Sequence, residues 1–211
     1  MIKDLPHPEV VRLDSDAISE AKAILYHAYK DEPTFRYLFD AERSGYEQRV
    51  RATIRELIDL HFASHQDVIG ITMNGRLVAV ALLGSPAIRL NLADQLNWRI
   101  RMMLTAGLAS TRRYIEYHEQ VTKCLPGTQR HDLPLMGVDT AHQGKGYGKL
   151  MVKAIEQLCR ENPRSAGIGL DTGNEKHAKF YESLGFEKVG EVKLGNVVES
   201  VMFKPASLLM N

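Results

Sequence analysis

The chain has 211 residues, of which 44% are apolar and 25% are charged, a size and balance typical of one large globular domain with a real hydrophobic core. Its 27 Lys and Arg nearly equal its 26 Asp and Glu, and a net charge of +1 excludes a general attraction to nucleic acid or to an anionic membrane. The opening stretch has no apolar run of signal-peptide length, and the longest purely apolar run, residues 77–83, is too short to cross a bilayer. We therefore expect a cytoplasmic protein.

The cysteines and histidines give no metal or redox motif. Cys124 and Cys159 lie far apart and in no CxxC pair, so we expect neither a disulfide framework nor a cysteine-built zinc site. His61 and His65 are one helical turn apart, but no Glu follows His61 as the HExxH pattern requires. Cys124 lacks a motif that would make it a nucleophile, so we interpret it as a small packing or loop residue. No bound metal is expected.

The N-terminal half predicts two helices and a hairpin. Apolar residues recur at helical spacing from Ile18 to Ala28, after possible N-caps at residues 14–16, and this helix should end near residues 31–33. A second helix is expected over residues 45–64. Two β-rich runs, residues 68–73 and 76–83, are separated only by Asn74 and Gly75, the pair that best adopts a type I′ turn.

The C-terminal half predicts alternating helices and strands. We expect helices from residue 85 to about residue 132, a strand over 133–139, and a helix with apolar positions from Tyr147 to Leu158 that stops before Pro163. A buried strand over 166–171, a helix over 175–184 and a closing hairpin of 186–193 with 197–203 follow. The order is that of a mixed α/β domain spanning residues 1–211, with residues 85–131 as a helical insertion.

A glycine-rich turn lies between a strand and an amphipathic helix. At a helix N-terminus the first N–H groups lack partners and the macrodipole is positive, so main-chain donors alone can bind a phosphate. Gly144, Gly146 and Gly148 have no Cβ to hold the phosphate away, while Lys145 adds a cation and Gln143 an amide donor. The segment therefore predicts a site for a diphosphate, although a glycine cluster can also be merely a flexible turn.

Two well-known phosphate loops do not fit this segment. No Ser or Thr follows a Gly-Lys pair, so it is not the loop of a nucleoside triphosphatase. The spacing of Gly144, Gly146 and Gly148 misses the last position of GxGxxG, which disfavours a dinucleotide-binding dehydrogenase.

The sequence QGKGYG resembles the Gln/Arg-x-x-Gly-x-Gly/Ala signature of the GNAT superfamily of N-acetyltransferases, with Gln143, Gly146 and Gly148 at its defining positions. A second stretch, LDTGNEKHAKFYESLGFEKVGE, is similar to the next block of that family. Its matching residues are Asn174, Phe180, Tyr181, Gly185 and Phe186. The two blocks cover about residues 133–191, and the predicted hairpin around Asn74 fits the central strands of the family more loosely.

This resemblance implies a splayed mixed central sheet flanked by helices, and acetyl-CoA as cosubstrate. Main-chain groups of Met136, Gly137 and Val138 would pair with the pantetheine arm as an added strand does. The amides of Gln143, Gly144, Lys145, Gly146, Tyr147 and Gly148 would hold the pyrophosphate. By the same carry-over Asn174 would touch the pantetheine, and Tyr181 would protonate the departing thiolate unless it is only a packing residue.

The sequence leaves the general base open. A lysine-like amine with a pKa of about 10.4 is almost wholly protonated at pH 7, so a base or a desolvating pocket must free its lone pair. We rank His131 first, because it lies just before the cofactor strand and could titrate near neutrality, ahead of Asp132, Glu116 and Glu119, with a relayed water as an equal alternative. The helical insertion should shape the acceptor pocket, which Trp98, Tyr114 and Tyr117 could line if they are not core residues.

The expected function is therefore acetyl transfer from acetyl-CoA to a primary amine of a small molecule, by direct attack within a ternary complex. The alternatives are a protein N-acetyltransferase, a sensor that binds acetyl-CoA without turnover, and a module whose glycine-lysine turn contacts RNA phosphates. No nucleic-acid or membrane partner is expected, and the chain should act as a monomer or homodimer. The sequence does not identify the acceptor amine, because fold alone does not determine substrate.

Overall fold

The fold was determined as a computed structural model, which describes residues 7–88, 91–127 and 129–209. Residues 1–6, 89–90, 128 and 210–211 of the predicted domain and insertion lie outside the described residues. The strands are β1 (Glu9–Arg12), β2 (Asp67–Met73), β3 (Arg76–Gly84), β4 (His131–Val138), β5 (Gly167–Thr172), β6 (Glu187–Leu194) and β7 (Val197–Pro205). The α-helices are α1 (Ile18–Tyr29), α2 (Pro33–Leu38), α3 (Tyr46–Ala63), α4 (Leu92–Thr105), α5 (Leu108–Cys124), α6 (Tyr147–Glu161) and α7 (Glu175–Glu182).

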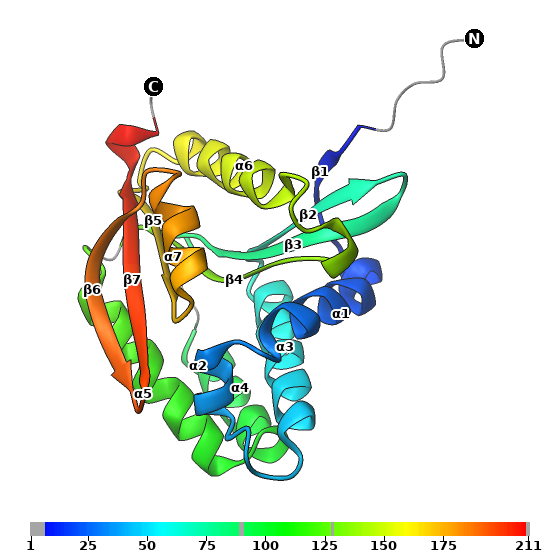
Figure 1. Cartoon of the computed structure of the whole chain (residues 1–211), viewed down its shortest axis with the longest axis vertical. Helices are drawn as coiled ribbons and strands as arrows, with labels where there is room; N and C mark the ends of the chain where they lie inside the picture. Colours follow the sequence, from blue (N-terminus) through cyan, green and yellow to red (C-terminus); the bar gives the residue numbers. More distant parts are fainter. Residues whose placement is uncertain (1–6, 89–90, 128, 210–211) are drawn as a thin grey trace.

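The strands form one seven-stranded sheet in the order β1-β2-β3-β4-β5-β7-β6. Neighbouring strands are antiparallel except for β4 and β5, which are parallel and pair only at His131 with Ile168 and at Asp132 with Gly169. Beyond that short contact the two strands separate, and the sheet opens at its middle (Figure 1). The mixed, splayed sheet expected from the resemblance is confirmed.

A β-bulge accounts for the place where the sheet opens. Leu82 pairs with Leu135 but Gly84 pairs with Asp132, so β4 has one more residue than β3 between these pairs. The bulged segment contains Pro134, which has no N–H to donate to a ladder. Leu133 and Leu135 accordingly pack into different hydrophobic clusters, on opposite faces of the sheet.

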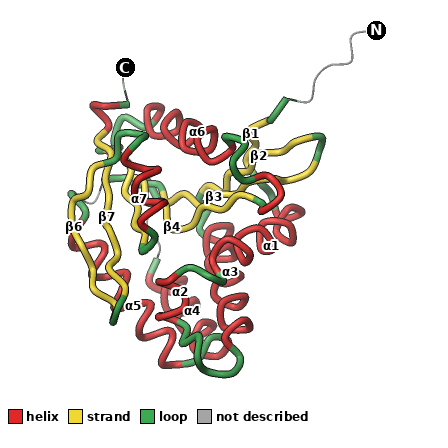
Figure 2. The backbone as a smooth tube through the Cα atoms, in the orientation of Figure 1, coloured by secondary structure: helices red, strands yellow, loops and turns green. Residues whose placement is uncertain are grey.

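Helices cover both faces of the sheet (Figure 2). Helix α6 packs on one face with the side chains of Ala79, Ala81 and Leu83 of β3, and Tyr181 of α7 belongs to the same cluster. On the other face Val80 and Leu82 meet α1 and α3, and residues of α5 belong to the same cluster. Alternate residues of β3 thus enter different cores, as the two-residue period of a strand requires.

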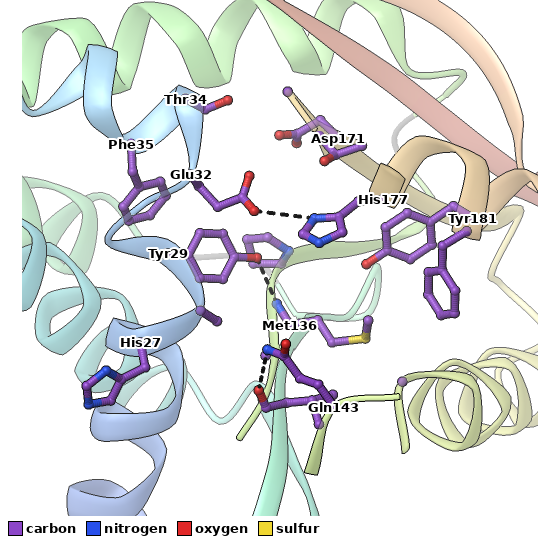
Figure 3. A pocket seen from close by; sticks show the side chains of 18 of the residues that line it. His27, Tyr29, Glu32, Thr34, Phe35, Met136, Gln143, Asp171, His177 and Tyr181 are labelled. Carbon is purple, nitrogen blue, oxygen red and sulfur yellow. Dashed lines mark hydrogen bonds and ion pairs between the residues drawn. The ribbon is translucent and has the colours of Figure 1, made fainter. Parts of the chain in front are cut away.

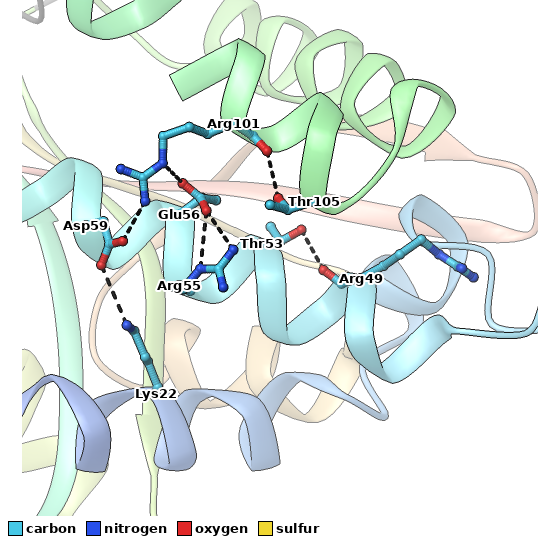
Figure 4. A network of polar contacts seen from close by, with 8 residues as sticks. All are labelled: Lys22, Arg49, Thr53, Arg55, Glu56, Asp59, Arg101 and Thr105. Atoms are coloured by element: carbon cyan, nitrogen blue, oxygen red, sulfur yellow. Dashed lines mark hydrogen bonds and ion pairs between the residues drawn. The ribbon is translucent and has the colours of Figure 1, made fainter. Parts of the chain in front are cut away.

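Ion pairs fasten the arm formed by α4 and α5 to α3 (Figure 4). Glu56 of α3 is only 2% exposed, and its carboxylate accepts hydrogen bonds from Arg55 and, at 2.6 Å, from Arg101 of α4. Arg101 also donates to Asp59 at 2.8 Å. Removal of one partner would leave a buried charge unpaired, so these contacts hold the arm in a defined position.

Most predicted elements are confirmed, and the differences are local. Asn74 and Gly75 both have positive φ, 52° and 74°, and join β2 to β3 as expected of a type I′ turn. The short elements β1 and α2 were not predicted, and β4 begins at His131, two residues earlier than expected. The stretch expected to be helical up to residue 132 forms α4 and α5, which ends at Cys124.

No helix within residues 7–88, 91–127 and 129–209 combines the length and the apolarity needed to span a membrane.

Candidate active site

One cavity of about 570 Å³ lies where β4 and β5 separate (Figure 3). Its volume falls within the range typical of small-molecule and cofactor sites. Three strands line it, β4, β5 and β7. The helices that line it are α1, α2 with the residue before it, α5, α7 and the start of α6 with the glycine turn. The cavity therefore joins elements from both halves of the sheet.

The start of α6 forms one end of the cavity. Gly146 is its N-cap with φ +87° and makes no side-chain capping bond, and the first helical bond runs from Leu150 N–H to Gly146 O. Gly144 also has positive φ, +74°, and a Cβ built at either glycine meets no atom within 4 Å. The N–H groups of the first turn of α6 thus face open space at the positive end of a helix dipole, which suits an anion.

Side chains hold the loop that leads into this turn. Gln143 donates its amide to Val138 O at 3.2 Å, so this side chain ties the turn back to β4. Asp139 accepts from Ala141 N–H at 3.0 Å and lies 2.9 Å from Nδ1 of His142. The contact with His142 is the largest cause that lowers the pKa of Asp139.

The free edge of β4 lines the middle of the cavity. Asp139 N–H donates to Val78 O of β3, so the alternate peptide groups of β4, including that of Met136, face the opening. The Met136 N–H is not vacant, because it donates to the Tyr29 hydroxyl at 3.0 Å. Gly137 packs under α1, where a Cβ would lie 3.0 Å from Cβ of Ala28.

Tyr181 points into the cavity from α7 and is 9% exposed (Figure 3). Burial, with Asp171 and Glu32 nearby, raises the pKa of Tyr181, so its phenol keeps its proton at neutral pH. The phenol of Tyr29 lies across the cavity, and burial beside Tyr181 likewise raises the pKa of Tyr29. Both groups can act as hydrogen-bond donors to a ligand.

Carboxylates dominate the other end of the cavity. Asp171 at the end of β5 and Glu199 of β7 both accept a hydrogen bond from Tyr117 of α5, and Thr34 of α2 donates to Glu199. The pKa of Glu199 is raised to about 9. Burial is the largest cause of this shift, and the nearby Asp171 is the second. Burial also raises the pKa of Asp171. The two groups titrate together, so protons are lost from the pair and not from either alone.

Glu32 provides a third carboxylate, separate from this pair. It precedes α2, and its Oε1 accepts from Asn174 Nδ2 at 3.3 Å and lies 3.4 Å from Nδ1 of His177. The side chain of His177 is 53% exposed while that of Glu32 is 14% exposed, so the pair connects the cavity with solvent.

The structure brings most of the expected cofactor residues to the cavity. The lining includes Met136, Gly137, Val138, Gln143, Gly144, Gly146, Tyr147 and Gly148, together with Tyr181. Lys145 is exposed and does not line the cavity, whereas Lys149, one helical turn later, does. Asn174 does not line it either, because its side chain caps α7 by accepting from Lys176 N–H at 3.0 Å and donates to Glu32.

The expected base, His131, is not at the cavity. It is 3% exposed within β4, its Nδ1 lies 2.8 Å from Ser165 Oγ, and burial lowers its pKa. The prediction that His131 lies just before the cofactor strand is wrong, because it is the first residue of β4, and at that position it does not line the cavity. The other candidates, Asp132, Glu116 and Glu119, do not line the cavity, and the first two form ion pairs with Arg130 and Arg112.

Of the aromatic residues expected in the insertion, Tyr117 lines the cavity. Trp98 and Tyr114 pack against each other in the core, with ring centroids 5.8 Å apart. Sequence reasoning missed Tyr29, Glu32, Asp171, His177 and Glu199. The available signal was weak: Asp171 precedes the matched Asn174 by three residues, and the others belong to no motif.

The described part of the chain brings together no group of three or more His, Cys, Asp or Glu side chains arranged to hold a metal ion.

Comparisons with known proteins agree with this geometry. The family model of the acetyltransferase (GNAT) domain matches residues 111–188, from α5 to the start of β6. No curated protein matches the chain.

Solved structures share the fold at low sequence identity. A structure described as histone acetyltransferase HPA2 and related acetyltransferase, from Corynebacterium glutamicum, has a TM-score of 0.69 and 20% identity over 94% of this chain and 96% of that one. The C-terminal condensation domain of Ebony, in complex with β-alanyl-dopamine, has a TM-score of 0.66 and 12% identity over 95% of this chain and 100% of that one. The aminoglycoside acetyltransferase AAC(6′)-Ib, in complex with coenzyme A, has a TM-score of 0.58 and 14% identity over 95% of this chain and 96% of that one. The match of the GNAT domain model over residues 111–188 and the shared fold make this chain similar to GNAT acetyltransferases.

Proposed function

We propose that this protein transfers an acetyl group from acetyl-CoA to a primary amine of a small molecule. The observation that carries the proposal is a continuous cavity that runs from the uncapped start of α6, past the phenol of Tyr181, to a group of carboxylates. An anion-binding end, a proton donor and a cation-binding end thus follow one another in the order that the two substrates require.

The residues at the α6 end fit the diphosphate of coenzyme A. Main-chain N–H groups of the first turn, the positive φ of Gly144 and Gly146, and the exposed amine of Lys149 all favour an anion there. The free edge of β4 then offers peptide groups to an extended pantetheine arm. When bound, acetyl-CoA supplies the activated acyl group as a thioester.

The remaining chemistry is proton transfer. Tyr181 lines the cavity and keeps its proton at neutral pH, so in this proposal it gives that proton to the departing sulfur, while the proton of the attacking amine passes to Glu32. His177, which contacts Glu32 and is half exposed, then carries that proton to solvent. Since amine attacks thioester directly, no enzyme nucleophile is needed.

Two solved neighbours support a small amine as acceptor. AAC(6′)-Ib is an aminoglycoside acetyltransferase, and the Ebony domain was solved with β-alanyl-dopamine. Carboxylates at the acceptor end of this cavity agree with an acceptor that enters as a cation.

The test combines calorimetric titration with coenzyme A and a thiol-release assay with acetyl-CoA over a panel of amines. Tyr181→Phe should lower kcat by about 10²-fold and leave coenzyme A affinity nearly unchanged, because only the acid is removed. Tyr114→Phe is the matched control: Tyr114 is also 9% exposed but does not line the cavity, so its kcat should stay near that of the wild type.

Four outcomes would contradict the proposal in different ways. Absence of coenzyme A binding by folded protein would overturn it entirely. Binding without thiol release for any amine would indicate a sensor, and release only with peptides would indicate a protein N-acetyltransferase. Equal rates for Tyr181→Phe and wild type would remove Tyr181 from the mechanism.

A further inference from the structure

Two carboxyl groups meet at the acidic end of the cavity. Asp171 of β5 and Glu199 of β7 both accept from the Tyr117 hydroxyl, and both line the cavity. Two ionised carboxylates this close in a buried site repel each other, so the pair retains a proton more readily than either group would alone. Burial first, and Asp171 second, raise the pKa of Glu199 to about 9, so Glu199 keeps its proton at neutral pH and any negative charge of the pair rests on Asp171.

The surroundings of this pair provide hydrogen bonds, and the basic side chain that acts on Asp171 is the imidazole of His118 on α5. Tyr117 and Thr34 donate to its oxygens, and Glu199 is only 2% exposed. No Lys or Arg among the described residues lines this end of the cavity, and Lys149 lies at the opposite end on α6. A buried charge without a Lys or Arg partner is unfavourable, and a ligand ammonium would compensate it.

Glu32 adds a second negative charge at another point of the same cavity. Its polar partners are Asn174 and the half-exposed His177, both on the α7 side and apart from the pair. Thr34, two residues later, donates to Glu199, so the main chain from residue 32 to residue 34 connects the two anionic points. They are close but distinct.

The phenol of Tyr181 independently indicates that a ligand occupies this space. Tyr181 is 9% exposed, and its side chain is directed into the cavity (Figure 3). Its hydroxyl has no hydrogen-bond partner within residues 7–88, 91–127 and 129–209. Its oxygen is not among the buried atoms that lack a partner, so it opens on the cavity, where a bound molecule can reach it as a hydrogen-bond partner.

We infer that the acceptor is a diamine, with one ammonium bound by Asp171 and Glu199 and the other amine presented to Glu32 and Tyr181 for acetylation. This inference rests on the proposed function and specifies its substrate class. Two separate anionic points match two cationic groups, whereas a monoamine would leave one of them unpaired.

The first experiment compares acceptors of equal chain length in the thiol-release assay: butylamine, aminobutanol and diaminobutane, then shorter and longer members of each series. We expect kcat/KM for the best diamine to exceed that of its monoamine by about 10- to 100-fold, as expected when a buried charge gains its partner. The hydroxyl of the amino alcohol carries no charge and should not reproduce this gain.

The second experiment uses the retained proton of Glu199 to design variants. Glu199→Gln mimics the protonated carboxyl and leaves one negative charge on Asp171, so the diamine preference should largely persist. The double variant Asp171→Asn with Glu199→Gln removes the charge but keeps amide hydrogen bonds, so the ratio of diamine to monoamine kcat/KM should fall toward one. Glu56→Gln is the control, because Glu56 is also 2% exposed but lies on α3 and does not line this cavity.

The outcomes separate this inference from the proposed function. Thiol release with diamines and monoamines at equal kcat/KM would overturn the inference and leave acetyl transfer intact. A double variant that folds, binds coenzyme A and keeps the wild-type ratio would also overturn it. If wild type fails to bind coenzyme A at all, the proposed function fails instead.

Discussion

The two ends of the cavity are built in different ways. The anion-binding end comes from one continuous stretch, from the free edge of β4 at Met136 through the glycine turn to Lys149 of α6. The acidic end combines single residues of four elements, and these side chains are Thr34, Tyr117, Asp171 and Glu199. A local motif therefore describes the first end, while the second exists only in the folded chain.

The difference follows from what each end binds. A diphosphate can be held by consecutive main-chain N–H groups, which requires a particular backbone and hence glycines at set positions. An ammonium needs carboxylates, which any neighbouring element can supply through its side chains. The predicted consequence is that substitutions at one end should affect one substrate and spare the other.

Gly173→Ala should have the largest effect, confined to the acidic end. A Cβ at Gly173 would lie 2.5 Å from Thr34 Oγ1 and 2.8 Å from Glu199 Oε2, so it must disrupt the hydrogen bond between them. We expect the acceptor KM to rise about tenfold or more, and the free energy of unfolding to fall by about 1 to 3 kcal/mol. Kinetics with saturating acetyl-CoA and urea unfolding would measure these effects.

Gly84→Ala serves as the control for this change, since its nearest atom to a new Cβ is at 3.5 Å, an ordinary contact. A loss of coenzyme A affinity in Gly173→Ala as great as its loss of acceptor affinity would break the distinction between the two ends.

Gly144→Ala should have an intermediate effect at the other end, and Gly75→Ala is its close match. Both glycines have φ +74° and open space where a Cβ would lie, so both variants should lose about 1 to 2 kcal/mol of unfolding free energy. Only Gly144 lines the cavity, so only its variant should weaken coenzyme A binding, by about fivefold to tenfold in calorimetry. Equal affinities of the two variants would place the diphosphate elsewhere.

The pH dependence of stability should show the smallest effect, again from the acidic end. Burial first, and Asp171 second, raise the pKa of Glu199 to about 9, whereas an unfolded Glu titrates near about 4.3. Between these values the folded protein binds more protons than the unfolded chain, so the free energy of unfolding falls as pH rises. The pKa of Asp171 is also raised, so this group changes the free energy of unfolding in the same direction. The pKa of Tyr117 is raised well above 10, so Tyr117 stays neutral over this range.

Urea unfolding of wild type and Glu199→Gln from pH 6 to about pH 9 would measure this contribution. The variant should lose less stability with rising pH, because one titrating carboxyl is absent. Parallel curves for the two proteins would show that Glu199 is already ionised in the folded state.

Much of the architecture could be predicted because it depends on local patterns. The Asn74–Gly75 turn, the amphipathic period of α6 and the closing hairpin around Gly195 are each properties of a few consecutive residues. β1 and α2 were missed because each is short: the four residues of β1 are stabilised by pairing with β2, and the six residues of α2 by packing of Phe35 and Leu38.

The amino-acid sequence alone determined the glycine turn, the strand and helix that flank it, and the placement of Tyr181 on a helix, since these depend on backbone preferences and short periods. Only the tertiary structure decided that His131 is buried beside Ser165, that α5 brings Tyr117 to the cavity, and that Asp171 and Glu199 meet at the Tyr117 hydroxyl. The physical reason is that burial and charge pairing join residues far apart in the chain, and no local pattern records which of them will meet.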